Sequence, residues 1–441
     1  MILPPGTRRC LPLLCMALLL VGCGNPAPSP FAGATAWTGA RIWTGEDEGY
    51  LEDAALIVRD GKVLAVHRGD LPHDVKVQDV SGHYLIPGLI NAHGHVGMAR
   101  GLDTGPAIHS RANVEAQLQL YARYGITTVI SLGDEPPQAF EARDEQNAAD
   151  PRMARLFLAG DVLHPPDAAS ARGKVEALMR MNPDWIKIRV DDHLGTADKM
   201  PPDVYGAVID ASNEFGRPLA SHMVTLEDAK GLLRAGTHLI AHSVRDAPVD
   251  NELIELMRER DICITPTLTR EVSVFVYAER PDFFDDPFFL KAADPDVLDA
   301  LQAPDMQARF TGRAADYYRA ALPLAKANML TLHEAGVRVA MGTDSGPPAR
   351  FQGYFEHMEM AMMQDAGMTP LEVLIAATRD AADCTGVGEH LGTLAPGKWA
   401  DFLLLGADPM QDVRHLRRLA GIVLAGHLQH FDDVPYAAEH R

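Results

Sequence analysis

The sequence predicts an α/β protein, a (β/α)8 TIM-like barrel with a small β-sandwich built from both terminal segments. Two observations support this prediction. Between residues 85 and 388, short apolar runs of strand length alternate with longer helical stretches, as in strand–helix units around a parallel sheet. Residues 36–84 and 389–432 instead contain short strand-like runs separated by Gly and Asp turns, which is typical of antiparallel β-structure.

Eight strand-like runs are expected to form the barrel. In chain order they are LIPGLIN, ITTVISL, ARLFLAG, DWIKIRV, PLASH, HLIAH, ICITPTL and VRVAMGTD. Their spacing is regular until residues 268–336, which form an insertion after the seventh run. Because the segment after a barrel strand begins on the catalytic face, we expect the insertion to cover the substrate. A longer barrel helix with a surface insertion is the alternative.

The terminal segments carry their own signals. Asp60-Gly61 separates two apolar runs in the first segment, which is a strong β-hairpin signal. GTLAPGKWADFLLLGADP and GIVLAGHLQHF in the second segment have the same short-strand character. We therefore expect both segments to pair in one domain beside the barrel.

The first 22 residues are expected to be an export signal. Arg8 and Arg9 precede an apolar stretch that is too short to span a bilayer and that ends in Leu-Val-Gly-Cys23. This ending resembles a bacterial lipoprotein box, which implies cleavage before Cys23 and lipidation of its thiol. Gly24 in place of Asp favours the outer membrane, with the protein facing the periplasm and residues 23–35 serving as a tether. An ordinary secretory signal is the alternative.

The net charge and the cysteines indicate which partners and which bonds to expect. The net charge of −20, with no basic stripe, makes nucleic acid an unsuitable partner and favours a small-molecule substrate. A homo-oligomer is compatible with the sequence. Of the five cysteines, only Cys263 and Cys384 follow Cys23, and we expect them to be buried free thiols, with a disulfide as the alternative.

Six residues occur in the order that a two-metal hydrolase needs, each in or at the end of an expected strand. They are His93, His95, Lys187, His222, His242 and Asp344. A single H-x-H pair means little, but alternate strand residues face the same side, so both imidazoles can reach one ion. Taken singly, the later histidines could be buried core residues, and Asp344 could cap the next helix.

Lys187 stands between two isoleucines in an apolar run. An unpaired ammonium would be costly to bury there, and a protonated amine cannot bind metal. Reaction with carbon dioxide would give a carbamate whose oxygens can bridge two cations. An ion pair with Asp191, Asp192 or Asp344 is the alternative.

The order of these six residues resembles the binuclear branch of the amidohydrolase superfamily. IPGLIN, YGITTVISLG, LGTLAPGKWADFLLL and HMEMAMMQDAGMTPLEVLIAATRDAA add to the likeness, the last of them to the imidazolonepropionase-like group that includes metal-dependent dipeptidases. The resemblance covers about residues 36–430. Asn91 departs from it, because many members carry Asp two residues before the first histidine.

The resemblance implies a mechanism with two divalent metal ions, for which zinc suits the ligands. His93, His95 and Asp344 would hold one ion and His222 with His242 the other, with carboxylated Lys187 as the bridge. A shared hydroxide would attack the carbonyl. Asp344 would act as general acid/base.

The reaction implied is hydrolysis of an amide bond, in a dipeptide or an N-acyl amino acid. Arg270, Arg189 and His193 are candidates for binding a substrate carboxylate, and Tyr277 for lining an apolar pocket with nearby phenylalanines. Each could instead be structural. A lactonase or phosphotriesterase on the same site is the alternative enzyme, and a non-catalytic binding barrel is disfavoured because all six residues are present.

Overall fold

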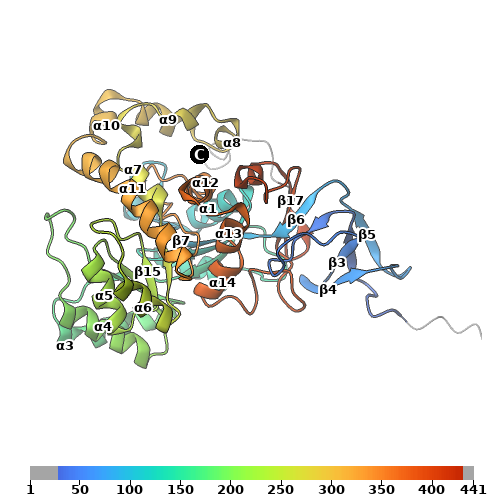
Figure 1. Ribbon diagram of the computed structural model, residues 1–441, viewed down its shortest axis with the longest axis horizontal. Helices are drawn as coiled ribbons and strands as arrows, with labels where there is room; N and C mark the ends of the chain where they lie inside the picture. The colour runs from blue at the N-terminus through green and yellow to red at the C-terminus, as the bar shows by residue number, and fades with distance from the viewer. Residues whose placement is uncertain (1–27, 431–441) are drawn as a thin grey trace, which may run out of the picture.

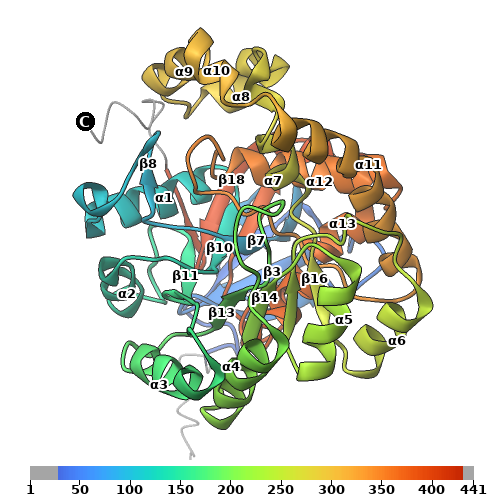
Figure 2. The same ribbon diagram turned by 90° about the vertical axis from the view of Figure 1, so that its left-hand side faces the viewer.

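The computed structural model describes residues 28–430, and the expected signal peptide, Cys23 and the first residues of the tether lie outside this range. The described chain is an α/β protein in which parallel strands lie in the middle with helices around them (Figure 2). The terminal strands, whose pairs are mostly antiparallel, lie at one end (Figure 1). No helix in residues 28–430 is long and apolar enough to cross a membrane.

The central strands form two parallel sheets. Their orders are β11-β10-β7 and β12-β13-β14-β15-β16. The strands are β7 (Leu89–Gly94), β10 (Ile126–Ser131), β11 (Arg155–Leu158), β12 (Val162–Leu163), β13 (Ile186–Arg189), β14 (Leu219–His222), β15 (Leu239–Ala241) and β16 (Cys263–Thr265). β12 is an additional short strand, and the other seven correspond to seven of the eight expected strands.

The eighth expected strand is replaced by an irregular extended segment, residues 338–345. Its backbone bonds to β16 on one side, where Ala340 donates to Ile264 over 2.9 Å. On the other side it bonds to β7, where His95 donates to Ser345 over 2.8 Å. Asp344 has a left-handed backbone with φ 57°, which a regular strand cannot accommodate. The segment thus spans the space between the two sheets without continuous pairing.

The helices follow the strands in alternation. They are α1 (Arg111–Arg123), α2 (Pro137–Asp144), α3 (Ala168–Met179), α4 (Pro202–Glu214), α5 (Leu226–Ala235), α6 (Asn251–Glu259), α11 (Arg313–Glu334), α12 (Tyr354–Ala366), α13 (Pro370–Ala376) and α14 (Arg379–Cys384), with short 3-10 turns η1 (Pro106–Ile108) and η4 (Val413–Arg417). Side chains cap several of them, as when Thr225 accepts from the backbone of Asp228 at the start of α5.

The terminal segments form two further sheets. Their orders are β4-β3-β1-β5 and β19-β18-β17-β6-β2. The strands are β1 (Thr35–Thr38), β2 (Arg41–Ile42), β3 (Ala54–Arg59), β4 (Lys62–Arg68), β5 (Lys76–Asp79), β6 (Tyr84–Pro87), β17 (Phe402–Leu405), β18 (Leu419–Leu424) and β19 (His427–Leu428). The predicted hairpin is present, with φ above zero at both Asp60 and Gly61.

One buried cluster draws on both terminal sheets. It contains Trp37 and Leu56 of the first sheet with Phe402 and Val423 of the second. The first and last parts of the chain are thus brought together, as β6 and β17 show (Figure 1). Ser29, within the expected tether, donates two hydrogen bonds to Asp74.

The cysteine prediction was wrong. Cys263 of β16 and Cys384 of α14 form a disulfide with a Cα–Cα distance of 5.8 Å and a sequence separation of 121. The fold brings the start of β16 against the last residue of α14, a proximity that no local pattern encodes. The bond therefore joins a central strand to a peripheral helix.

The insertion is mostly helical and packs on itself. It contains α7 (Leu268–Ser273), η2 (Val276–Ala278), η3 (Asp282–Asp285), α8 (Pro287–Leu290), α9 (Pro295–Leu301), α10 (Pro304–Ala308) and α11. Tyr277, Phe284 and Phe289 are buried in one aromatic cluster. The cluster also contains Tyr124 and Phe355, so it packs the insertion against the end of α1 and against α12. Helices α8, α9 and α10 lie at one edge of the molecule (Figure 2).

Candidate metal centre

The six residues singled out from the sequence line one cavity of about 330 Å³. His93 lies within β7, Lys187 within β13, His222 at the end of β14, and His242 directly after β15. Parallel strands present their carboxyl ends on one side, so residues at these positions converge. The sheet thus brings together side chains that are as much as 251 positions apart.

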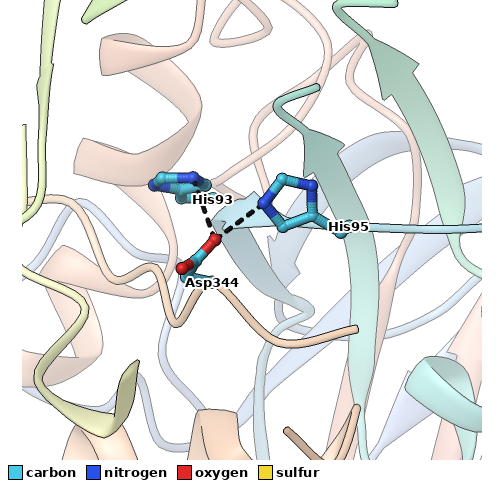
Figure 3. Close-up of side chains that lie close together, drawn as sticks. All are labelled: His93, His95 and Asp344. Atoms are coloured by element: carbon cyan, nitrogen blue, oxygen red, sulfur yellow. Dashed lines mark hydrogen bonds and ion pairs between the residues drawn. The ribbon is translucent and has the colours of Figure 1, made fainter. Parts of the chain in front are cut away.

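His93, His95 and Asp344 make the tightest group. A ligand atom from each lies within 4.8 Å of the others, and Asp344 sits between the two imidazoles (Figure 3). Its Oδ1 is 2.7 Å from His95 Nε2 and 3.5 Å from His93 Nε2. The other ring nitrogen of His95 is 2.8 Å from the Gly133 carbonyl. This contact orients the ring so that Nε2 faces the cavity.

Lys187 is buried beside His93, with 3.2 Å between its Nζ and His93 Nε2. Burial lowers the pKa of Lys187 to about 8. Among residues 28–430 the ammonium has no carboxylate partner within ion-pair distance, so the alternative of an ion pair with a neighbouring aspartate is not found. A buried, unpaired amine of lowered pKa is well suited to react with carbon dioxide.

His222 and His242 form the second pair, with ring centroids 4.2 Å apart. Each has a partner on one nitrogen: His222 Nε2 is 3.1 Å from Asp191 Oδ2, and His242 Nδ1 is 2.7 Å from Thr267 Oγ1. The free nitrogen of each ring remains for a ligand. Burial lowers the pKa of His222 to about 3 and that of His242 well below its usual value. Both rings are therefore neutral, as metal binding requires.

His93 and Asp344 are also held in the charge states that metal binding requires, a neutral imidazole and a carboxylate. Burial, with Lys187 nearby, lowers the pKa of His93 well below its usual value. Burial alone would raise the pKa of Asp344, but Arg350 and His95 hold it well below its usual range. Neutral imidazoles with one carboxylate and a reactive amine make a donor set that fits divalent cations.

Asn91 lies beneath this group and does not reach the cavity. Its amide donates to Glu356 over 2.7 Å and to Thr343 over 3.0 Å, and its oxygen accepts from the His93 backbone. Burial raises the pKa of Glu356. The Asn91 side chain thus holds the backbone of His93 and the side chain of Thr343.

Three of the four residues proposed for substrate binding line the cavity, namely Arg189, His193 and Arg270. Arg270 is buried, lies over the ring of Tyr318 and pairs with Glu271. Its Nε makes no hydrogen bond but lies 3.9 Å from Asp344 Oδ2. Tyr277 does not line the cavity. It is fully buried in the insertion, and its hydroxyl donates to the Ala349 carbonyl over 2.6 Å.

Sequence reasoning missed two residues of the site. Asp191 was considered only as a partner for Lys187, but it instead orients His222. Arg350 was not considered, yet its guanidinium pairs with Asp344 and lines the cavity. Arg350 lies six residues after Asp344, and a Gly-Pro-Pro sequence stands between the two. This sequence is typical of a turn, and it was the local sign that the chain could fold back there.

Comparison with known proteins identifies the family. Residues 84–428 match the amidohydrolase family, and the chain belongs to that family, as the sequence predicted. Members of this family are hydrolases that generally use metal ions. The group of His93, His95 and Asp344 described above agrees with this, because it could hold a metal ion.

The relatives extend over most of the chain. An uncharacterized protein of Mycobacterium tuberculosis is 26% identical over 357 residues, covering 78% of this chain and 85% of the relative. The imidazolonepropionase of Brevibacillus brevis is 24% identical over 405 residues, covering 80% of this chain and 83% of that enzyme.

Solved structures agree on the fold. A putative prolidase from Bifidobacterium longum superimposes with a TM-score of 0.72 at 25% identity, covering 91% of this chain and 95% of that one. A Xaa-Pro dipeptidase with bound methionine gives a TM-score of 0.72 at 20% identity, covering 90% and 99%.

Proposed function

We propose that the protein is a metal-dependent hydrolase that cleaves an amide bond in a dipeptide or an N-acyl amino acid. The observation that carries this proposal is one cavity lined by four buried imidazoles, a buried lysine and an aspartate, with Arg270 beside them. The similarity to a putative prolidase supports an amide substrate.

The donor set suits two divalent cations, with zinc as the expected metal. His93, His95 and Asp344 would hold one ion, and His222 with His242 the other. Carboxylated Lys187 would bridge them, in keeping with its burial and lowered pKa. Two cations held in this way would ionise a water for attack and polarise the scissile carbonyl.

The chain's own residues would then handle protons and substrate charge. Asp344 faces the cavity and is deprotonated, so it can accept a proton and return it to the departing amine. Arg270 lines the cavity with a guanidinium whose Nε makes no hydrogen bond and lies 3.9 Å from Asp344 Oδ2, and a guanidinium suits the carboxylate of the substrate. Glu271 keeps the Arg270 guanidinium in place.

Lactone or phosphotriester hydrolysis is the second candidate, because the same metals would serve it. Those substrates carry no carboxylate, so they leave the buried Arg270 Nε unsatisfied. Hydrolysis of an amide substrate that carries a carboxylate would use the Arg270 guanidinium, and we favour this function for that reason. A non-catalytic binding barrel would not need a deprotonated aspartate among the imidazoles.

We also propose that the protein is a lipoprotein anchored through Cys23 and exported to face the periplasm. The disulfide supports export, because such bonds persist in oxidising compartments. Strands β7 to β16 with residues 338–345 would form one barrel, and the two terminal sheets would form one sandwich beside it.

Metal analysis of the full-length protein, purified without chelators, tests the proposal. We expect about two metal ions per chain, falling to one or fewer in Lys187→Ala because the bridge is lost. The wild-type protein should release amines from a panel of dipeptides and N-acyl amino acids. A protein that binds no metal after zinc and bicarbonate are added, and that hydrolyses no amide, would overturn it.

A further inference from the structure

A second and larger cavity, of about 760 Å³, lies directly beside the metal cavity. Pro347 and Arg350 line both cavities. Met98 lines the smaller one and the next residue, Ala99, lines the larger one. We call the larger cavity the side chamber. Its size falls in the range of small-molecule sites, about 300–1,000 Å³.

Four parts of the chain wall the side chamber. They are α1, the hairpin of β8 (Ala99–Arg100) and β9 (Asp103–Thr104), the insertion around α9, and the loop of residues 346–352. The insertion contributes Val297 and Ala300 here, while only Arg270 of the insertion reaches the metal cavity. The insertion therefore forms part of the chamber wall.

Apolar side chains form part of the wall of the side chamber. Ala99, Leu102, Ala116, Leu120, Val297 and Phe351 contribute to it. The polar side chains of the wall are largely engaged with the protein itself. Gln117 donates to the Ala99 carbonyl and accepts from the Gly97 backbone, and Gln352 donates to the His95 carbonyl. Satisfied amides give a polar ligand little to bind.

Charged groups of the chamber lie mainly at its exposed edge. Arg100, Asp103 and Asp296 are exposed, whereas Ala99, Ala116 and Val297 are buried. Buried apolar side chains beside amides that already have partners suit an unbranched hydrocarbon chain better than a peptide, whose backbone groups would find few free hydrogen-bond partners there.

We propose that the side chamber receives the acyl chain of an N-acyl amino acid whose carboxylate is held by Arg270 in the metal cavity. This rests on the amide-hydrolase function proposed above and selects one of its two substrate classes. The amide would lie at the metal ligands, and the acyl chain would pass between Met98 and Arg350. The loop that carries Arg350 is fixed there by the Tyr277 hydroxyl.

The test compares N-acetyl, N-butanoyl, N-hexanoyl and N-octanoyl forms of one amino acid. The full-length protein is held in lipid nanodiscs, with empty discs correcting for partition. We expect kcat/KM to rise at least about tenfold from acetyl to octanoyl, because each added methylene leaves water. Isothermal titration of the N-octanoyl compound with metal-free protein gives a second readout that needs no turnover.

Two variants block the chamber and one serves as a matched control. Ala112 of α1 is exposed and Ala300 of α9 is half-buried, and both line the chamber, so tryptophan fits without disturbing the core. Ala112→Trp and Ala300→Trp should remove the chain-length preference and weaken N-octanoyl binding. Ala169→Trp, on exposed α3, should behave as wild type.

The outcomes are distinguishable. N-acetyl turnover with no gain from longer chains, or chain-length preference that survives both tryptophans, would overturn the acyl-chain proposal alone. Dipeptides preferred over every N-acyl amino acid would do the same. Absence of any amide hydrolysis would instead overturn the proposed function.

Discussion

At the scale of single residues, the site depends on groups that hold the proposed ligands in the right charge state. Asp191 and Thr267 each take one nitrogen of a histidine and leave the other free. Burial keeps the rings of His222 and His242 neutral. The geometry is thus set largely by neighbours that would not themselves touch a metal.

Arg270→Met should weaken substrates that carry a carboxylate. A hydrogen bond to a charged group contributes about 1.5–3 kcal/mol, so we expect KM to rise about 10- to 100-fold with a smaller change in kcat. Glu271 stays paired with Arg245 in the variant, so no carboxylate is left alone. The measurement is steady-state kinetics on an N-acyl amino acid.

The control for that prediction is the same substrate with its carboxylate converted to an amide. Its KM should be nearly the same in wild type and Arg270→Met. An equal loss for both substrates would mean that Arg270 has only a structural role.

At the scale of elements, α12 holds the start of α7 through one buried carboxylate. Glu359 accepts from the backbone of Leu268 and Thr269 and from the Thr269 hydroxyl, all at 2.7 Å. The same turn carries Thr267, which contacts His242. Burial raises the pKa of Glu359 to about 7. This helix contact therefore depends on pH.

The sign of that dependence is testable with Glu359→Gln. The folded pKa of Glu359 lies above the unfolded value near 4.5, so its contribution is fully present below pH 4.5 and is lost as pH rises toward 7. Glutamine does not titrate. The melting temperature of Glu359→Gln relative to wild type should rise between pH 4.5 and 7.5, and a difference that is constant with pH would contradict this.

At the scale of the whole molecule, long-range links join parts that are distant in sequence. β6 pairs with β17, and the Arg155–Asp401 ion pair, with two N–O contacts, connects β11 with the segment before β17. The disulfide adds a covalent link between β16 and α14. Early and late parts of the chain consequently stabilise each other.

Removing the disulfide should destabilise the fold. The Cys263→Ala/Cys384→Ala variant should lose about 2–5 kcal/mol in free energy of unfolding, since a loop of 121 residues is no longer closed. Urea denaturation with and without reductant measures it. Reductant should shift the wild-type midpoint toward that of the variant and leave the variant unchanged; an unaffected wild type would contradict the prediction.

Membrane attachment is predicted to depend on Cys23. Cys23→Ser should abolish incorporation of labelled fatty acid and release the protein from the membrane fraction, because the acylated thiol is missing. Cys15→Ser, which changes a cysteine inside the apolar stretch, is the matched control and should remain acylated. Labelling that persists in Cys23→Ser would refute the lipoprotein assignment.

The sequence predicted what depends on local pattern. Apolar runs with a polar residue at or after the end identified seven strands, and with them the positions of His93, Lys187, His222 and His242. It could not predict pairings made by the fold. Cys263 with Cys384, Arg350 with Asp344, and Tyr277 with Ala349 each join segments whose meeting depends on how loops and helices return to the sheet.

The left-handed backbone at Asp344 limits how this position can change during evolution. With φ at 57°, Asn and Gly can occupy it with little strain, whereas β-branched residues would be forced into an unfavourable region. A descendant that loses the carboxylate while keeping the fold is therefore expected to carry Asn or Gly there. The left-handed backbone at position 344 would thus remain in a protein that no longer has the carboxylate.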